Sequence, residues 1–329
     1  MNRRPPRVRV VCAAPLHFLQ ETRRDMARRF RLTEAFGDSR KALAAKLLDA
    51  EAFIPNPGTP FRIDARVLDS ARRLRIVVTP STGTDHVDLD YCRSRGIAVK
   101  GLLTRPRLLE EIHASAEFSF CLLLAMIRRL LPASAAAVRG VWREAEDRFR
   151  GIELAGKRVS LVGYGRIGRK MGRYLKAFGA EVTVYDPFVR VAGPFPRQAR
   201  TLDAALRRAD IVCLHAPFNE STAGMLDSAA FGKMRRGAYF VNTSRGGMVV
   251  EEDLIAALRS GRLAAAAVDV IRGEQDSDIS RNPLVRFART HANLIVAPHI
   301  AGLTVDSQRK AMLFAAEEIR RFFASGGRP

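Results

Sequence analysis

Three short polar segments hold the side chains of this sequence that are best suited to chemistry. Each follows an apolar run that is typical of a buried strand. The segments read Asn242-Thr243-Ser244-Arg245-Gly246-Gly247, Asp269-Val270-Ile271-Arg272-Gly273-Glu274 and Pro298-His299-Ile300-Ala301-Gly302. Because ligand sites of open α/β sheets form at the carboxyl ends of strands, we expect a cation, two carboxylates and an imidazole to meet there.

This set of groups matches what the reduction of a 2-keto acid requires. Arg245 can hold a carboxylate through two hydrogen bonds and polarise the keto oxygen. His299 can donate the proton as hydride arrives at the carbonyl carbon, and a hydrogen bond from the imidazole to Glu274 would raise the imidazole pKa. Taken singly, each residue has a structural alternative: an interface ion pair, a structural histidine or a solvated glutamate. Their joint occurrence after successive strands favours the catalytic interpretation.

A second stretch, residues 157–186, predicts a dinucleotide-binding unit. An apolar run at 159–162 leads into a G-x-G-x-x-G turn formed by Gly163, Gly165 and Gly168. An amphipathic helix and a second apolar run follow and end at Asp186. A glycine turn in an ordinary βαβ unit is the alternative, and the order of the elements favours the cofactor. Asp186 lies 18 residues after Gly168, where a carboxylate would accept from ribose hydroxyls and repel the 2′-phosphate of NADP.

The composition describes a globular chain with room for two domains. The 329 residues are 47% hydrophobic and 27% charged, and no apolar run reaches the length of about 18 residues that a membrane helix needs. We therefore expect a cytoplasmic protein. The four cysteines show no C-x-x-C spacing, so we expect reduced, buried thiols and no metal site. The net charge of +21 could attract nucleic acid, but the arginines are spread along the chain without a recognition motif, and nucleic-acid binding is not expected.

Strands and helices alternate along the sequence, which predicts an α/β fold. We expect a Rossmann-type, doubly wound parallel dinucleotide-binding domain over residues 107–301. Residues 1–106 and 302–329 are expected to form a smaller flavodoxin-like α/β substrate domain. A long helix is predicted over 109–131. After it, residues 132–156 form an arm around Trp142 that either packs against a partner subunit or remains a surface segment of the monomer.

Several motifs together resemble the D-isomer-specific 2-hydroxyacid dehydrogenase family. They extend from about Leu74 to Thr304 and read STGTDHVDLDYCRSRGIAV, HASAEFSFCLLLA, LVGYGRIG with YDP, HAPFNEST, VNTSRGG with EEDLIAAL, AAVDV and APHIAG. The resemblance implies that Arg245, Glu274 and His299 form the catalytic trio. It also implies a homodimer with an active site in the cleft between the domains, and it places Asp269 beside the nicotinamide carboxamide.

Two departures from the family pattern concern the rigidity of the loop after Glu274 and the nature of the substrate. Gln275 follows Glu274 where the family usually has proline, and the loop 56–58 lacks the basic residue typical of phosphoglycerate-oxidising members. The second departure argues against a phosphorylated substrate, although Arg105 and Arg107 can compensate. The resemblance implies that the substrate carboxylate binds to backbone near Thr82. The expected substrate-binding residues are Asn56, Thr82, Gly83, Thr84 and Arg245.

The resulting prediction is an NAD-dependent oxidoreductase that interconverts a small D-2-hydroxy acid and its 2-keto acid. The alternative is an NAD-sensing, corepressor-like regulator on the same fold. The cofactor is expected to contact the glycine turn and the loops after later strands. The expected cofactor-binding residues are Gly163, Gly165, Arg166, Ile167, Gly168, Asp186, Pro187, His215, Ala216, Pro217, Thr222, Thr243, Ser244, Asp269 and Gly302.

Overall fold

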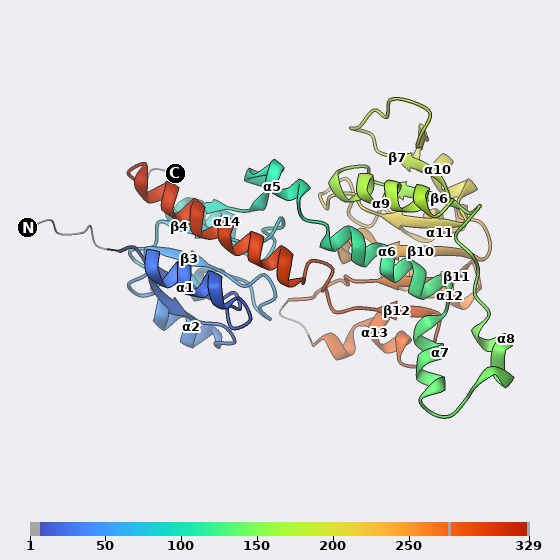
Figure 1. Ribbon diagram of the computed structural model, residues 1–329, viewed down its shortest axis with the longest axis horizontal. Helices are drawn as coiled ribbons and strands as arrows, with labels where there is room; N and C mark the ends of the chain where they lie inside the picture. The colour runs from blue at the N-terminus through green and yellow to red at the C-terminus, as the bar shows by residue number, and fades with distance from the viewer. Residues whose placement is uncertain (1–6, 276–277, 328–329) are drawn as a thin grey trace, which may run out of the picture. The chain divides into compact units, whose positions relative to one another are not determined.

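The computed structural model describes residues 7–275 and 278–327, which divide into two compact units (Figure 1). Unit 1 comprises the described residues of Met1–Ile112, Gln275–Ser277 and Leu303–Pro329. Unit 2 comprises His113–Glu274 and Asp278–Gly302. Each unit is built around its own parallel sheet.

Unit 1 contains a five-stranded sheet in the order β2-β1-β3-β4-β5, with every pair parallel. This is the strand order of flavodoxin-like folds, as predicted. The strands are β1 (Arg9–Cys12), β2 (Arg31–Glu34), β3 (Ala52–Ile54), β4 (Ile76–Val78) and β5 (Ala98–Lys100). The helices are α1 (Gln20–Arg29), α2 (Arg40–Leu47), α3 (Ala65–Leu68), α4 (Leu89–Ser94), α5 (Pro106–Glu110) and α14 (Val305–Ala324).

Alternating strand residues of unit 1 face two separate layers of helices. Ile76 and Val78 of β4 pack in a cluster with Met26 of α1 and with α14, whereas Val77 packs in a second cluster with α2, α3 and α4. Successive side chains of a strand point to opposite faces of the sheet. Burial on both faces explains why these strands read as continuous apolar runs.

Unit 2 contains a seven-stranded parallel sheet in the order β12-β11-β10-β9-β6-β7-β8. The order reverses between β6 and β9, as in doubly wound dinucleotide-binding folds. The strands are β6 (Arg158–Val162), β7 (Glu181–Tyr185), β8 (Arg197–Gln198), β9 (Ile211–Leu214), β10 (Ala238–Asn242), β11 (Leu263–Val268) and β12 (Leu294–Val296). The helices are α6 (Ala114–Ile127), α7 (Leu130–Ala137), α8 (Glu146–Phe149), α9 (Arg166–Ala177), α10 (Leu202–Arg208), α11 (Ser228–Lys233), α12 (Glu251–Arg259) and α13 (Pro283–Ala288).

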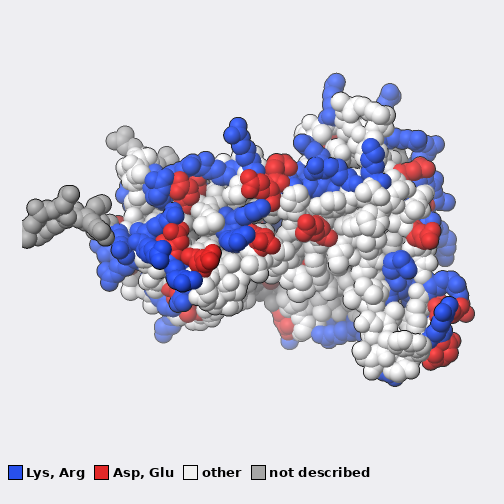
Figure 2. Space-filling model, viewed as in Figure 1, with Lys and Arg blue, Asp and Glu red and all other residues white. Residues whose placement is uncertain are grey.

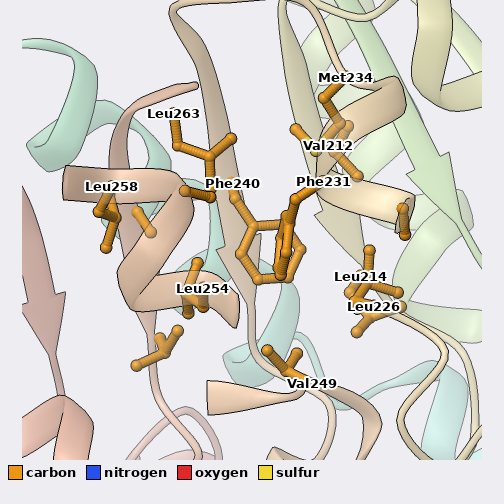
Figure 3. Close-up of a cluster of buried hydrophobic side chains, with 14 of the residues drawn as sticks. Val212, Leu214, Leu226, Phe231, Met234, Phe240, Val249, Leu254, Leu258 and Leu263 are labelled. Carbon is orange, nitrogen blue, oxygen red and sulfur yellow. The ribbon is translucent and has the colours of Figure 1, made fainter. Parts of the chain in front are cut away.

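The larger sheet also has a core on each face. On one face, Phe240 of β10 meets Phe231 of α11 edge to face, with ring centroids 5.6 Å apart (Figure 3). Residues of α10, α12 and α13 join this cluster. On the other face, α6 and α9 cover Val241 and Cys213. The two cores anchor the strands at whose carboxyl ends the polar segments lie.

The predicted long helix over 109–131 is wrong. The chain forms α5, then α6, then α7, and α5 belongs to unit 1 whereas α6 and α7 belong to unit 2. Arg129 has a φ of +53°, and a residue in that left-handed conformation cannot continue a right-handed helix. The edge strand β2 was not expected because its sequence, RLTE, is largely exposed and lacks an apolar pattern.

The surface differs from expectation at one cysteine. Cys12, Cys92 and Cys213 are buried thiols as predicted, and burial raises the pKa of Cys213 to about 12. Cys121 is exposed, because α6 buries Leu122, Leu123 and their helical neighbours instead. Basic side chains are spread over the visible face with acidic ones among them (Figure 2).

Within residues 7–275 and 278–327, no single helix is long and apolar enough to cross a membrane. One pair, Pro106–Ile127 with Leu130–Ala137, reaches the required length and composition only when the two are taken together across a 64° bend.

Candidate active site

The three polar segments converge in unit 2, at one edge of its sheet. β10, β11 and β12 are neighbouring parallel strands, with Asn242 in register with Val268 and Val268 with Val296. Arg245, Asp269 and His299 each come after one of these strands. Because parallel strands end at the same edge of a sheet, the three residues lie at that edge. Gly246 allows the first two loops to lie together, since a Cβ there would come within 2.0 Å of the Ile271 carbonyl carbon.

His299 and Glu274 form a hydrogen-bonded pair through the imidazole Nδ1 and the carboxylate Oε2. The other carboxylate oxygen, Oε1, accepts from the backbone N–H of Ile271 at 2.9 Å. The hydrogen bond that His299 donates to Glu274 raises the pKa of His299, burial and Arg245 lower it, and Asp269 adds to the rise. The side chain of His299 is 48% exposed, so its outer nitrogen can be reached from solvent.

Asp269 holds the backbone that follows His299. Its two carboxylate oxygens accept from the N–H groups of Ile300 and Ala301 at 2.9 and 2.8 Å, and its carbonyl accepts from the N–H of His299 at 2.8 Å. His299 itself has a φ of +55°, a conformation that a non-glycine residue keeps only when its neighbours impose it. Burial raises the pKa of Asp269, and the two amide bonds oppose that rise. The carboxylate therefore sets the position of the imidazole.

Arg245 stands half-buried at the end of β10. Its Nη1 donates to the carbonyl of Ser244 at 2.8 Å, and its positive charge lowers the pKa of His299. The turn beneath it is held by Asn242, whose amide accepts from the N–H of Ser244 and donates to the carbonyl of Arg245. The arrangement supplies a fixed cation beside a proton donor.

The glycine turn fits a dinucleotide. A Cβ at Gly163 would come within 2.4 Å of the Ala216 nitrogen, and one at Gly168 within 2.3 Å of the Gly163 oxygen. Gly165 faces open space, and no side chain caps the N-terminus of α9 behind it. A pyrophosphate therefore has room to approach the N-terminus of the helix.

Asp186, at the end of β7, is tied to this turn. One carboxylate oxygen accepts from the N–H of Tyr164 at 2.8 Å, and the other from the N–H groups of Phe188 and Val189 at 2.9 and 3.2 Å. Pro187 lies between Asp186 and Phe188 in the chain. The carboxylate is thereby held beside the glycine turn, where a ribose would lie.

Two side chains that follow neighbouring strands at this edge of the sheet have buried polar atoms with no hydrogen-bond partner among the described residues. They are His215, through both ring nitrogens, and Thr243, through Oγ1. These residues directly follow β9 and β10, which pair in register up to Leu214 and Asn242. Burial lowers the pKa of His215 to about 4, so its imidazole is neutral. Orphaned buried polar atoms require an explanation, and a bound polar group such as a cofactor supplies one.

The remaining expected cofactor residues shape the same loops. Thr222 Oγ1 donates to the carbonyl of Pro217 at 2.9 Å, and Ser244 Oγ donates to the carbonyl of Leu214 at 2.9 Å. Arg166 and Ile167 open α9, and Gly302 is the last residue of unit 2. Unit 2 thus carries every expected catalytic and cofactor-binding residue.

The expected substrate loops belong to unit 1, and sequence reasoning missed what shapes them. Thr82, Gly83 and Thr84 follow β4, and Asn56 follows the neighbouring strand β3. The β4 loop is braced by Thr79, which hydrogen-bonds both Ser81 Oγ at 2.8 Å and Nε2 of the buried His86 at 3.0 Å. Ser81 in turn donates to the carbonyl of Gly83 at 2.7 Å. An isolated histidine gives no sequence signal for such a role.

Asn56 and Arg105 are engaged within unit 1. The side chain of Asn56 accepts from the N–H of Gly58 at 3.1 Å, which forms a tight turn. Arg105 Nε donates to the buried carboxylate of Glu318 at 2.8 Å. The Arg105 guanidinium is therefore not a free cation that compensates for the missing basic residue, whereas Arg107 is exposed.

Two family models match the chain. The model for the D-isomer specific 2-hydroxyacid dehydrogenase, NAD binding domain, matches residues 120–301, and the model for the catalytic domain of that family matches residues 8–105. D-3-phosphoglycerate dehydrogenase of Mycobacterium leprae is 35% identical over 286 residues, which cover 86% of this chain and 51% of that protein. The chain spans about half the length of the phosphoglycerate dehydrogenase relatives that it matches.

Two further similarities cover most of both proteins. Glyoxylate reductase of Thermofilum pendens is 35% identical over 266 residues, 78% of this chain and 74% of that protein. The crystal structure of D-lactate dehydrogenase from Aquifex aeolicus, complexed with NAD and lactic acid, superposes with a TM-score of 0.77 at 25% identity. That alignment covers 97% of this chain and 96% of the other.

Proposed function

The chain belongs to the D-isomer specific 2-hydroxyacid dehydrogenase family, and from that premise we propose that it interconverts a small, unphosphorylated D-2-hydroxy acid and its 2-keto acid. NAD is the cofactor. When bound, it supplies or accepts the hydride. In this proposal unit 2 binds NAD and unit 1 provides the substrate loops, with boundaries near residues 106 and 302.

The observation that carries the proposal is the His299–Glu274 pair beside Arg245. Nδ1 of His299 is occupied by the carboxylate, which leaves Nε2 as the nitrogen that can exchange a proton with substrate. In keto-acid reduction, the protonated imidazole donates to the developing alkoxide while the Arg245 guanidinium binds the carboxylate. In the reverse direction, the neutral imidazole accepts that proton. Glu274 favours the charged imidazole and keeps Nε2 directed outward.

Other residues of unit 2 would hold the cofactor. The N–H groups at the start of α9 would bind the pyrophosphate, and Asp186 would accept from the ribose hydroxyls. The ring nitrogens of His215 and Oγ1 of Thr243 would form hydrogen bonds with the nicotinamide half of the cofactor. An acid at Asp186 favours NAD over NADP because a 2′-phosphate beside it would be repelled.

The choice of an unphosphorylated substrate follows from charge. One relative is named a D-3-phosphoglycerate dehydrogenase and another a glyoxylate reductase. In this chain the loop 56–58 is uncharged, and Arg105 is engaged with Glu318. Of the two arginines that could compensate, only Arg107 is exposed. A phosphate would therefore find fewer cations near the expected substrate loops, whereas a glyoxylate-sized acid needs none beyond Arg245.

A spectrophotometric screen at 340 nm tests this function. The purified chain is given NADH, and separately NADPH, with glyoxylate, pyruvate, hydroxypyruvate, longer 2-keto acids and 3-phosphohydroxypyruvate. We expect NADH oxidation with one or more of the unphosphorylated acids. Preference for 3-phosphohydroxypyruvate would contradict the substrate class, and preference for NADPH would contradict the role of Asp186. Tight NADH binding without any turnover would favour the NAD-sensing regulator.

Homodimerisation is a further part of the proposal. Leu130 and Leu131 of α7, and Val138 and Trp142 of the arm at 132–156, are large apolar side chains exposed by 58%, 50%, 85% and 72%. Several exposed apolar groups in one segment of the chain favour a protein interface. Light scattering after gel filtration would report a mass near twice that of the chain, and a monomer would contradict it. A cytoplasmic location stays a prediction.

A further inference from the structure

The loop that carries Glu274 is held by a buried carboxylate outside the catalytic trio. Glu251 opens α12 and is 3% exposed. Its Oε1 accepts from the backbone N–H of Arg272 at 2.6 Å, and its Oε2 accepts from Nδ2 of Asn282 at 2.9 Å. Nδ2 of Asn282 also donates to the carbonyl of Arg272 at 3.3 Å. Glu251 and Asn282 together bind both main-chain polar groups of Arg272, and we refer to them as the clamp.

The clamp is itself anchored to two helices. Oδ1 of Asn282 accepts from the N–H groups of Leu284 and Val285 and so caps α13. Burial raises the pKa of Glu251, and the bonds from Arg272 and Asn282 oppose that rise. A buried carboxylate is costly unless it is hydrogen-bonded, and an ionised acceptor makes a stronger bond than a neutral one. Such an acceptor is suited to holding one backbone amide in place.

The clamped backbone leads directly to Glu274. Gly273 has a φ of +68°, and the chain turns there so that Glu274 Oε1 accepts from the N–H of Ile271. Its Oε2 meets Nδ1 of His299. The orientation of the carboxylate therefore depends on residues 271–273, which have the clamped Arg272 at their centre.

We propose that Glu251 and Asn282 are positioning residues, which fix the backbone of Arg272 so that the Glu274 carboxylate meets His299. The inference rests on the proposed function and assigns neither side chain a contact with substrate or cofactor. The charged groups that face His299 are Glu274, Arg245 and Asp269. Of these, the Glu274 carboxylate is the one that follows the clamped backbone.

A set of four variants separates this role from simple packing. Glu251→Ala removes the acceptor for Arg272. Asn282→Ser keeps an oxygen that can cap α13 but removes both Nδ2 bonds. Glu252→Ala changes the exposed neighbour on the same helix and serves as the matched control. Circular dichroism and thermal unfolding establish that each variant is folded before its kinetics are measured.

We expect Glu251→Ala and Asn282→Ser to lower kcat by about 10- to 100-fold, the cost of misplacing a reacting group by about an ångström. The KM for NADH stays near wild type. The pH limb of kcat/KM that reports His299 moves to lower pH, because a displaced carboxylate stabilises the imidazolium less. Glu251→Gln keeps an oxygen for the Arg272 amide. Its kcat and its pH limb should therefore lie between those of Glu251→Ala and the wild type. Glu252→Ala behaves as wild type.

An unchanged limb in both clamp variants would overturn the inference even if kcat fell, since lost packing lowers kcat without moving a pKa. A nuclear magnetic resonance titration of the His299 imidazole, assigned with His299→Ala, measures the same pKa without turnover. If the wild type reduces no 2-keto acid, the proposed function fails, and the titration still decides the inference. A lower imidazole pKa in both variants supports it, and an unchanged value contradicts it.

Discussion

Two carboxylates of the molecule bind cations in different ways. Glu318 of α14, in unit 1, is buried and contacts both Lys100 and Arg105. Glu274, in unit 2, is 28% exposed and contacts one imidazole, whose side chain is 48% exposed. Lysine and arginine keep their protons near neutral pH, whereas histidine can release its proton there. The first cluster can only hold the chain together, and the second can also transfer a proton.

The largest effect should come from removing the titratable cation. His299→Ala is expected to lower kcat by about 10²–10⁴-fold, the usual contribution of a general acid. His291→Ala is the control, because that histidine stacks on Phe287 in the same unit, with ring centroids 3.8 Å apart, and is assigned no chemistry. Steady-state kinetics at saturating NADH measure both variants. Activity near wild type in His299→Ala would remove the catalytic assignment.

Removing the charge of Glu318 from the cluster in unit 1 should lower stability and leave activity unchanged. Glu318→Gln leaves Lys100 and Arg105 without their buried counter-charge. Both cations are about a third exposed, so we expect a loss of about 1–3 kcal/mol in the free energy of unfolding, below the cost of a fully buried pair.

Glu317→Gln is the matched control on the same helix. Its carboxylate pairs with the exposed Arg320 and Arg321, so the loss should stay within about 1 kcal/mol. Urea-induced unfolding measures both variants, and kcat per folded molecule should be retained. A fall in kcat without a loss of stability in Glu318→Gln would contradict the purely structural role.

The functional cluster was predictable from sequence, and the structural one was not. Glycine spacing and the apolar runs before Arg245, Asp269 and His299 are local signals, and a parallel sheet brings strand ends together whatever the intervening length. Glu318 lies in an amphipathic helix more than two hundred residues from Lys100. A single glutamate on a helix gives no sign of which distant cations it will meet.

The same reasoning explains the remaining misses. The helix over 109–131 was predicted from a segment that is mostly apolar from Phe118 onward, and that pattern gives no sign of the left-handed conformation of Arg129. Glu251 reads as an ordinary acidic residue in the first turn of a helix. Its bond to Arg272 crosses from one loop to another and depends on the packed structure. Local patterns therefore predicted that the proposed catalytic side chains would lie at one edge of a sheet, but they gave no sign of the groups that hold them.

A smaller effect is expected when the charge of Glu274 is removed from its pair with His299, because this should shift the pH dependence of kcat/KM. Glu274→Gln keeps the size of the side chain and removes its charge, so the pKa of His299 loses its main upward cause. In keto-acid reduction His299 must be protonated, and activity falls as pH rises through its pKa. The descending limb of kcat/KM should therefore lie at lower pH in Glu274→Gln than in the wild type. Profiles that superimpose would show that Glu274 does not control the imidazole.

The smallest expected effect is on thermal stability as a function of pH. Because Glu274 raises the folded-state pKa of His299 above its ordinary value of 6.5, protonation stabilises the folded chain. That contribution is fully present below pH 6.5 and is lost as pH rises through the folded-state pKa. The Tm difference between wild type and Glu274→Gln should therefore be largest in mild acid and shrink above neutrality. Glu318→Gln should show no such trend around neutrality, because Glu318 is paired with a lysine and an arginine and not with a histidine. A parallel trend in the two variants would remove the distinction between the clusters.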